Sequence, residues 1–412
     1  MKILYIAHRI PYPPNKGDKI RSFHEIKYLS EFHEIHLAAL VDNPDDYQYE
    51  KDLQKYCAKI CLASIHPGTD RIKSLLSPIC GKPLSVGYFY SGTLQKKIKQ
   101  WLSQYSYGAV ICFSSPVAEY LFASPAWKSW FPDGRRKTKK HRPELIMDFC
   151  DLDSDKWRQY SDKTLFPFSL LYRLEYKFLL AYEKKINRIF DRSVFISRQE
   201  AELFYTLYPK ARSVCIIPNG VDHDYFSFRN PDLPVPEKKG PILLFTGAMD
   251  YYANADGVCW FCEEIFPLIR KRYSNARFYI VGSKPHPKVK DLGKNPHVHV
   301  TGFVEDIRPY YEMADISVIP LRIARGVQNK VLEAMSMGKA IVTTPTAVQG
   351  ISFDCSNAVQ VAGTPSDFAE SVLFFLENET IRQKYGNNAR GFVKKYYDWQ
   401  QNMQHLEECI LG

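Results

Sequence analysis

Short apolar runs alternate with amphipathic segments through most of the chain, and this alternation most constrains its fold. Residues 3–7 form a near-continuous apolar run, as in a strand buried on both faces. A polar loop follows, then a helical apolar stripe from about Asp18 and a second apolar run at residues 35–41. Further strand-like runs lie at residues 109–113, 145–149, 193–196 and 214–217. Because strand–helix–strand alternation aligns neighbouring strands in parallel, it predicts a parallel sheet covered by helices.

One interruption of this pattern indicates two domains. After residues 218–222 comes a loop-like segment, residues 228–241, with four prolines, and strand-like runs resume at residue 242. A chain of 412 residues is also too long for one core. We therefore predict two Rossmann-like, doubly wound α/β domains facing a central cleft, since ligands bind at the carboxyl ends of such strands. The predicted domains are residues 1–222, with a C-terminal helix of about 390–412 packing back on them, and residues 223–389.

The composition excludes several classes of protein. The chain is 45% hydrophobic and 14% aromatic, which argues against disorder. Its net charge of +10 favours anionic ligands, but no nucleic-acid-binding signature accompanies it, so we predict no nucleic-acid partner. The first apolar run is too short for a signal peptide, and no run approaches the ~20 residues of a membrane span. We expect a cytoplasmic protein, and peripheral contact with the inner face of the cytoplasmic membrane stays open.

The ten cysteines are scattered, and several lie in apolar runs, as is typical of buried free thiols in a reducing compartment. Cys259 and Cys262 have the spacing of half a metal site. They lie in an apolar helical segment, and no second Cys/His pair has matching spacing, so we interpret them as core residues. We predict no metal and no cofactor.

Residues 326–342 are the strongest candidate for a ligand site, with a glycine turn, a short helix, a small-residue stop and a strand. The turn aims backbone N–H groups and a helix N-terminus at one point, which favours phosphate. Lys330 and Glu333 share a helix face, where a cation and a hydroxyl-accepting carboxylate suit a nucleotide-sugar. The alternative is a surface helix with an ordinary Lys/Glu pair. The turn residues are Gly326, Val327, Gln328 and Asn329.

Other predicted strand ends also carry candidate residues. Gly17 opens the first helix, where an anion can approach the backbone; the alternative is that Asp18 simply caps this helix. Carboxylates after a strand of the first domain can bind sugar hydroxyls, act as bases, hold a metal or cap a helix. These acids are Asp148, Asp151, Asp153 and Asp155. Glycine turns follow strands of the second domain at Gly247, Gly282 and Gly302, the last preceding Phe303 and Val304.

Together these residues resemble the retaining GT-B glycosyltransferases of family 4, over essentially the whole chain. The more specific matches lie in and beside the second domain, at residues 218–222, 280–282, 301–306, 314–320 and 332–342. A finer resemblance is to a subgroup associated with exosortase/PEP-CTERM exopolysaccharide loci. It rests on residues 17–22, 246–251 and 325–330.

The resemblance implies hexosyl-type transfer, with retention, from a nucleoside-diphosphate sugar to a glycan or lipid-linked acceptor in exopolysaccharide or cell-surface glycan synthesis. It implies that the second domain binds the donor, with Glu333 on the ribose and residues 302–304 near the base. Residues 326–330 would hold the diphosphate and sugar, and Gly17 would lie near the phosphates. The first domain would bind the acceptor.

The chain departs from the family at three places. Arg325 stands where the first of two glutamates spaced eight apart is common, and residues 249–254 lack the usual Arg and Lys. A frequent histidine at the acceptor-side strand end is not evident either. Arg325 and Lys330 are then our candidates for neutralising the diphosphate, and Asp151 for orienting the acceptor or acting as a base.

Other interpretations stay open. A GT-B nucleotide-sugar epimerase would turn over donor without acceptor, and a non-catalytic nucleotide-sugar-binding partner protein would bind donor without transfer. The basic, aromatic segment 166–173 and the basic run 135–142 favour contact with an anionic membrane that presents a lipid-linked acceptor. The alternative for these segments is a solvated face with a core stripe.

Overall fold

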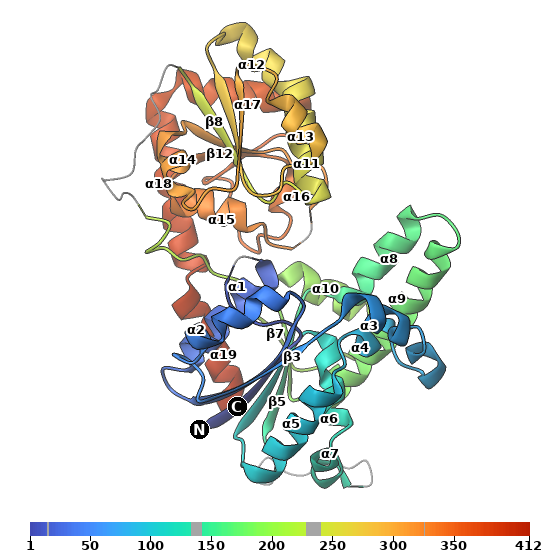
Figure 1. Ribbon diagram of the computed structural model, residues 1–412. Coiled ribbons are helices and arrows are strands. Elements are labelled where there is room, and N and C mark those ends of the chain that lie inside the picture. Colours follow the sequence, from blue (N-terminus) through green and yellow to red (C-terminus); the bar gives the residue numbers. More distant parts are fainter. Residues whose placement is uncertain (15, 133–141, 228–239, 325) are drawn as a thin grey trace. The chain divides into compact units, whose positions relative to one another are not determined.

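The strands of the computed structural model form two parallel sheets (Figure 1). The structure describes residues 1–412 except 15, 133–141, 228–239 and 325. One unit comprises Met1–Ile217 and Met403–Gly412, and the other comprises Pro218–Asn402. The divide therefore falls five residues before the expected one, and only the last residues of the C-terminal region belong to the first unit.

The first sheet has seven strands in the order β3-β2-β1-β4-β5-β6-β7, all paired in parallel. The central strands β1, β4 and β5 are buried along nearly their whole length, which explains their continuous apolar sequences. The strand bounds are Lys2–Ala7 (β1), Glu34–Val41 (β2), Lys59–Ser64 (β3), Ala109–Phe113 (β4), Glu144–Cys150 (β5), Arg192–Phe195 (β6) and Val214–Ile216 (β7).

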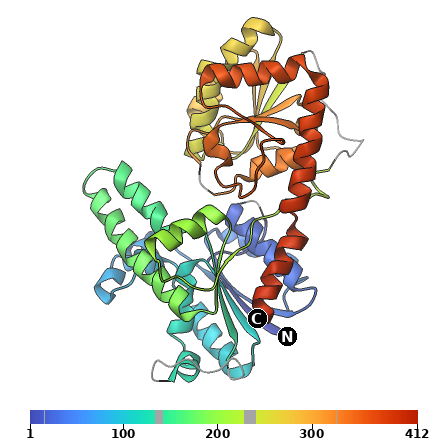
Figure 2. The same cartoon turned by 180° about the vertical axis from the view of Figure 1, so that it is seen from behind.

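Helices connect these strands, and α8 and α9 form a hairpin that projects beyond the sheet (Figure 2). The α-helices are Gly17–Leu29 (α1), Glu50–Leu53 (α2), Pro67–Ser74 (α3), Leu84–Tyr88 (α4), Gly92–Gln104 (α5), Glu119–Phe122 (α6), Pro125–Trp130 (α7), Asp153–Lys163 (α8), Phe168–Ile189 (α9), Arg198–Leu207 (α10) and Trp399–Leu411 (α19). Short 3-10 helices span Pro44–Tyr49 (η1), Ser77–Cys80 (η2) and Ser115–Ala118 (η3).

The second sheet has six strands in the order β10-β9-β8-β11-β12-β13, again all parallel. Its order reverses between β8 and β11, and in the first sheet between β1 and β4. Ligands of doubly wound sheets bind beyond the strand carboxyl ends at such reversals. The bounds are Ile242–Thr246 (β8), Arg277–Val281 (β9), Val298–Gly302 (β10), Ile316–Ile319 (β11), Ala340–Thr343 (β12) and Gln360–Val361 (β13).

Helices of the second unit complete a separate hydrophobic core. For example, α17 begins at Pro365 because the Thr364 hydroxyl accepts a hydrogen bond from the backbone N–H of Asp367 at 3.2 Å. Helix α18 packs on α15 and β12 of this unit, which is why residues 390–402 belong to the second unit and only those from Met403 join the first. The helices are Tyr252–Trp260 (α11), Phe266–Arg272 (α12), Pro287–Leu292 (α13), Arg308–Met313 (α14), Asn329–Ser336 (α15), Pro345–Val348 (α16), Pro365–Glu377 (α17) and Glu379–Tyr396 (α18), with a π-helical turn at Phe261–Ile265.

Within the described part of the chain, no helix combines the length and apolar character that crossing a membrane requires.

Candidate functional site

The segment after β11 folds as a glycine turn followed by a helix, as predicted. Gly326 has a left-handed backbone with φ of 61°, and a side chain on Gly350 would clash with its carbonyl, so the turn packs tightly. Helix α15 then runs for eight residues and ends before Gly338, which has φ of 60° and stops the helix. Five of its eight residues are buried, so the alternative of a surface helix is wrong.

The first turn of α15 presents backbone N–H groups. Val327 packs against the core, Gln328 occupies the N-cap position and Asn329 is the first helical residue. The Gln328 side chain makes no capping hydrogen bond to the helix. An α-helix whose first N–H groups lack such a cap offers an anion both donors and the positive end of its dipole.

Lys330 extends from α15 to the carboxyl end of β8. Its Nζ donates a hydrogen bond to Asn254 Oδ1 at 2.5 Å and lies 4.7 Å from the centre of the Phe245 ring. The Asn254 amide in turn donates to the carbonyl of Ala248 at 2.8 Å, which fixes its orientation. Burial lowers the pKa of Lys330 to about 8, although the nearby charge of Glu333 opposes this shift.

Glu333 is half-buried one helical turn after Lys330 and is approached by a buried tyrosine. The Tyr311 hydroxyl lies 3.4 Å from Glu333 Oε2 and 2.8 Å from the Thr246 hydroxyl. Burial raises the pKa of Glu333 to about 7, against the charge of Lys330 and the hydrogen bond from Tyr311. The carboxyl group therefore changes protonation near neutral pH, and a hydrogen-bond donor or a cation beside it would favour the ionised form.

Two glycine turns line the same edge of the sheet. A β-carbon on Gly282 would lie 1.8 Å from the carbonyl oxygen of Gly247, and one on Gly247 would lie 2.8 Å from Asn254 Nδ2. Their φ values of 151° and 153° are also unfavourable for any other residue. These turns bring the backbone close to Lys330, whose Nζ would be 3.2 Å from a β-carbon on Gly247.

The end of β10 is more open. Gly302 has φ of 71° with no atom within 4 Å of a β-carbon, Phe303 is 75% exposed, and Val304 is partly buried. An open hollow of about 640 Å³ runs along β10 and includes Gly302, but neither Lys330 nor Glu333 lines it. The structure thus gathers Gly247, Gly282, Lys330 and Glu333 most closely, and Arg325 lies outside the described residues.

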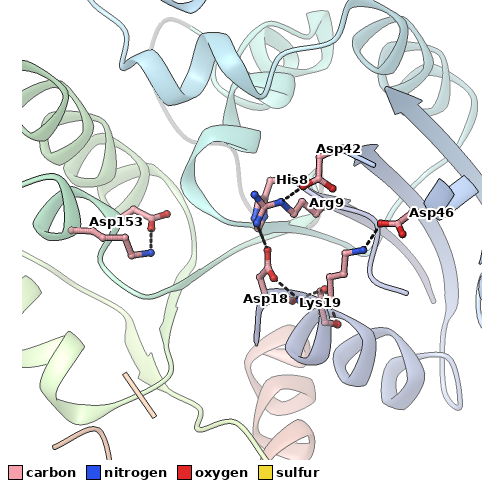
Figure 3. A network of polar contacts seen from close by, with 9 residues as sticks. His8, Arg9, Asp18, Lys19, Asp42, Asp46 and Asp153 are labelled. Carbon is pink, nitrogen blue, oxygen red and sulfur yellow. Dashed lines mark hydrogen bonds and ion pairs between the residues drawn. The ribbon is translucent and has the colours of Figure 1, made fainter. Parts of the chain in front are cut away.

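In the first unit, the loop after β1 and the start of α1 carry a charged network (Figure 3). Arg9 Nη1 donates to Asp18 Oδ2 at 2.7 Å, and His8 Nε2 lies 3.3 Å from the same oxygen. Arg9 Nε also reaches Asp42 Oδ2 at 3.0 Å. Burial would raise the pKa of Asp18, but His8 and Arg9 hold it well below its usual range.

Gly17 opens α1 and is exposed, with no atom within 4 Å of a β-carbon. Packing within the unit therefore does not require glycine there. The helix begins at Gly17 with Lys16 in the N-cap position, so the alternative that Asp18 caps it is wrong. From within the first turn, the Asp18 carboxylate accepts a hydrogen bond from the backbone N–H of Lys19 at 3.0 Å and binds the preceding loop through Arg9.

The acids within and after the last residues of β5 have separate roles. Asp148 is fully buried and binds Arg21, whose Nη2 donates to it at 2.6 Å, so it belongs to the core rather than to an open site. Asp153 and Asp155 lie in the first turn of α8 and pair with Lys156 and Arg158 at 2.9 and 2.7 Å.

Asp151 is half-buried, directly after the turn at the end of β5. Cys150 has φ of 63° there, which redirects the chain from the strand towards α8. The position at a strand carboxyl end is the one expected for a residue that meets a ligand. The sequence did not indicate Tyr311 or Asn254, because their roles arise from contacts between separate elements.

No three His, Cys, Asp or Glu side chains of the described residues are grouped so that they could hold a metal ion.

A match to a known protein family lies within the second unit. Residues 240–378 match the family model described as glycosyl transferases group 1, and they include Lys330, Glu333, Gly247 and Gly282. An uncharacterized 44.6 kDa protein in the cps region of Klebsiella pneumoniae is 20% identical over 413 residues, which cover 96% of each protein.

Solved structures extend the likeness to the whole chain. HepE of Anabaena, in complex with UDP and glucose, has a TM-score of 0.66 and 14% identity, with 100% of both chains covered. WaaG, a glycosyltransferase involved in lipopolysaccharide biosynthesis, has a TM-score of 0.63 and 16% identity over 100% of both chains. The fold is that of the GT-B glycosyltransferases. In this GT-B fold, the group 1 sequence signature lies in the second unit, which also contains Lys330 and Glu333.

Proposed function

We propose that this GT-B protein is a retaining glycosyltransferase that moves a hexosyl group from a nucleoside-diphosphate sugar to a glycan or lipid-linked acceptor. The observation that carries the proposal is the placement of Lys330 and Glu333. Lys330 lies at the end of β8, held by Asn254, and Glu333 lies one turn further along a helix with an uncapped N-terminus. A diphosphate and a polyhydroxylated group fit these two features, respectively.

The second unit would bind the donor. The N–H groups of α15 and the Lys330 ammonium would hold the diphosphate, and Glu333 would accept hydrogen bonds from ribose hydroxyls. Phosphate oxygens next to Lys330 would favour its protonated form and so raise its pKa from about 8. Gly302, Phe303 and Val304 would contact the base, and the exposed ring of Phe303 offers a stacking surface.

The chemical step would depend on leaving-group stabilisation, without a metal or other cofactor. Charge that develops on the β-phosphate would meet Lys330 and the helix N–H groups, with Arg325 as a further candidate. The acceptor hydroxyl would attack the sugar on the same face from which the phosphate leaves, and an oxygen of that phosphate would help take the proton of the hydroxyl. Asp151 would orient the acceptor or assist as a base, and Gly17 would leave room for the phosphates.

An acceptor in cell-surface or exopolysaccharide synthesis is the finer proposal. It is supported by the likeness to WaaG and by the resemblance of residues 17–22 to exosortase-associated enzymes. A lipid-linked acceptor would require contact with the cytoplasmic face of a membrane. Arg142 of the basic run does not serve this contact, because it is buried and binds Asp191 at 2.6 Å. Residues 135–141 of that run lie outside the described residues.

Exposed apolar side chains support the membrane contact. Leu165, at the turn between α8 and α9, is 87% exposed, and Leu170, in the first turn of α9, is 53% exposed. The exposed basic residues Arg173 and Lys177 follow on α9. A core stripe does not explain side chains exposed to this degree. Exposed apolar residues next to cations are typical of contact with an anionic bilayer. The region of α3 and η2 adds Ile72, Leu75, Leu76 and Ile79.

Flotation with anionic and neutral vesicles tests this contact. We expect the protein to float with phosphatidylglycerol vesicles, and the L165S/L170S variant to remain largely in the soluble fraction. Leu411→Ser is the matched control, because Leu411 is exposed but lies at the end of α19. Equal flotation of all three proteins would remove the α8–α9 turn from the proposal.

The decisive experiment for the function is a donor panel. Thermal shift with UDP, GDP, ADP, CDP and dTDP should identify one base, since a ligand at 100 times its Kd stabilises by about 2.7 kcal/mol. The matching labelled nucleotide-sugars are then incubated with and without a membrane extract as acceptor. Label in a glycan or lipid product supports transfer. Free sugar without acceptor would indicate the epimerase alternative, and binding without turnover a non-catalytic partner.

A further inference from the structure

Two cysteines far apart in sequence meet at the edge of the first sheet. Cys215 lies on β7 and Cys409 on α19, 194 positions later, and the Cys409 thiol donates a hydrogen bond to Cys215 Sγ at 3.1 Å. Both are half-buried, and β7 is the edge strand of its sheet. All ten cysteines belong to the described residues and are free, so the two sulfurs are unbonded neighbours.

A cation accompanies the pair. Val194 on β6 pairs with Cys215, and side chains alternate along a strand, so Arg192 projects on the same face as Cys215. Arg192 Nε is buried without a hydrogen-bond partner. The hydrogen bond from Cys409 and, more weakly, the Arg192 charge lower the pKa of Cys215 to about 7 against the effect of burial. The same hydrogen bond raises the pKa of Cys409 well above its ordinary value.

This asymmetry assigns different chemistry to the two sulfurs. A thiol with a pKa near the ambient pH combines a substantial thiolate fraction with good nucleophilicity. Cys215 is therefore suited to attack, and Cys409 to resolve the intermediate. Cys80 is exposed, unlike the half-buried pair, and has no neighbouring thiol among the described contacts.

We propose that Cys215 and Cys409 form a thiol–disulfide exchange site that reacts with low-molecular-weight disulfides such as oxidised glutathione. The Cys215 thiolate attacks one sulfur of glutathione disulfide, and one glutathione leaves as a thiolate that takes up a proton. Cys409 then loses its proton and attacks the Cys215 sulfur of the mixed disulfide, which releases the second glutathione. The two protein thiols are oxidised to one disulfide, and the glutathione disulfide is reduced to two thiols.

The new bond would join the C-terminal helix to the first sheet. The end of α19 already contacts this unit through Glu407, which lies 3.1 Å from the Tyr28 hydroxyl and 3.4 Å from His33 Nε2. A covalent link across so long a chain segment restricts the unfolded state strongly. Oxidation should therefore raise the melting temperature of the full-length protein by about 5 °C or more.

The test is treatment of the native full-length protein with oxidised glutathione, followed by alkylation and peptide mapping. A Cys80→Ser background removes the exposed thiol. We expect a Cys215–Cys409 linked peptide and no lasting glutathione adduct. With Cys409→Ser added, the reaction should stop at a glutathione adduct on Cys215. With Cys215→Ser added instead, Cys409 should react with oxidised glutathione at least tenfold more slowly than Cys215 does in the Cys409→Ser variant.

Two outcomes would overturn the proposal. One is a stable glutathione adduct, or no modification, at Cys215 in the protein that keeps both cysteines. The other is linkage of Cys215 or Cys409 mainly to a different cysteine. A control without glutathione, kept in dithiothreitol, establishes that the linked peptide requires the oxidant.

Discussion

At the scale of single residues, the candidate site is defined by charges that the fold places partly out of water. Lys330 and Glu333 have pKa values displaced towards each other by burial, to about 8 and about 7. Such displaced values are more frequent at functional sites than on ordinary surfaces. The sequence pattern selected both residues as candidates, and their role stays a prediction. It was not sufficient to find Asn254 and Tyr311, because nothing in their local spacing records that they contact α15.

The first prediction concerns Lys330. Lys330→Ala should lower kcat/KM for sugar transfer about 10²–10³-fold, because a positioned cation that stabilises the leaving phosphate is removed. Steady-state assays with the donor identified by thermal shift measure this loss. Lys384→Ala is the matched control, since Lys384 is an exposed residue of α18 and does not line the hollow along β10. Near-normal turnover of Lys330→Ala, with the fold intact, would remove this lysine from the mechanism.

The second prediction concerns the pH dependence of stability. The folded state raises the pKa of Glu333 from 4.5 to about 7, so between these values the folded protein binds more protons than the unfolded one. Stability contributed by this group is therefore present below pH 4.5 and is lost as pH rises to 7. Glu333→Gln has no such loss. Without ligand, the free energy of unfolding of this variant relative to the parent protein should therefore be about 1–2 kcal/mol higher at pH 8 than at pH 5.

Calorimetry of both proteins at the two pH values measures this difference. Lys330 adds a contribution of opposite sign at the upper pH, because its pKa is lowered to about 8 and the unfolded state there binds the extra proton, so that stability rises with pH. Since the Glu333 charge opposes that shift, the same comparison in a Lys330→Met background removes the contribution of the lysine. An unchanged difference between parent and variant at pH 5 and pH 8 would mean that Glu333 is fully ionised in the folded protein.

At the scale of elements, local pattern predicted most of the strands, and the exception is informative. The strands of the second unit and the buried strands of the first read as apolar runs, since a parallel sheet is covered on both faces. Strand β3 was missed, because it is an edge strand whose residues are mostly half-exposed and so carry no continuous apolar pattern. Beyond the ends of β8 and β9, the backbones of Gly247 and Gly282 lie in contact, which requires residues without a side chain. The sequence shows the two glycines but not the contact between them.

The third prediction tests that contact. Gly282→Ala should lower the free energy of unfolding of the second unit by about 3 kcal/mol or more, because the methyl group meets the Gly247 carbonyl and the φ of 151° is strained. Gly391→Ala is the control, since Gly391 is an exposed residue of α18 with open space around a β-carbon. It should stabilise by about 0.5–1 kcal/mol. Equal stabilities of the two variants in chemical denaturation would contradict the steric argument.

At the scale of the whole molecule, the chain has two separate hydrophobic cores. One comprises residues of the first sheet and its helices, and the other contains residues of the second sheet, with α15 among its helices. The sequence predicted two domains because the alternation stops and resumes. It placed the boundary a few residues late and assigned too much of the C-terminal region to the first unit. The unit to which the C-terminal region belongs depends on whether α18 packs on α15, and a helical sequence pattern alone does not indicate this contact.

The fourth prediction follows from the separation of these cores. Asp148→Asn removes one partner of the fully buried Arg21, which also pairs with Glu25, and should destabilise the first unit by roughly 3 kcal/mol. Hydrogen exchange read by mass spectrometry should then speed up in β1, β4 and β5 and remain unchanged in β8, β11 and β12. Gly282→Ala should give the reverse pattern, which makes each variant the control for the other. If both variants speed exchange equally in both sheets, the two cores unfold as one cooperative unit, and the stability of the donor site would depend on the entire chain.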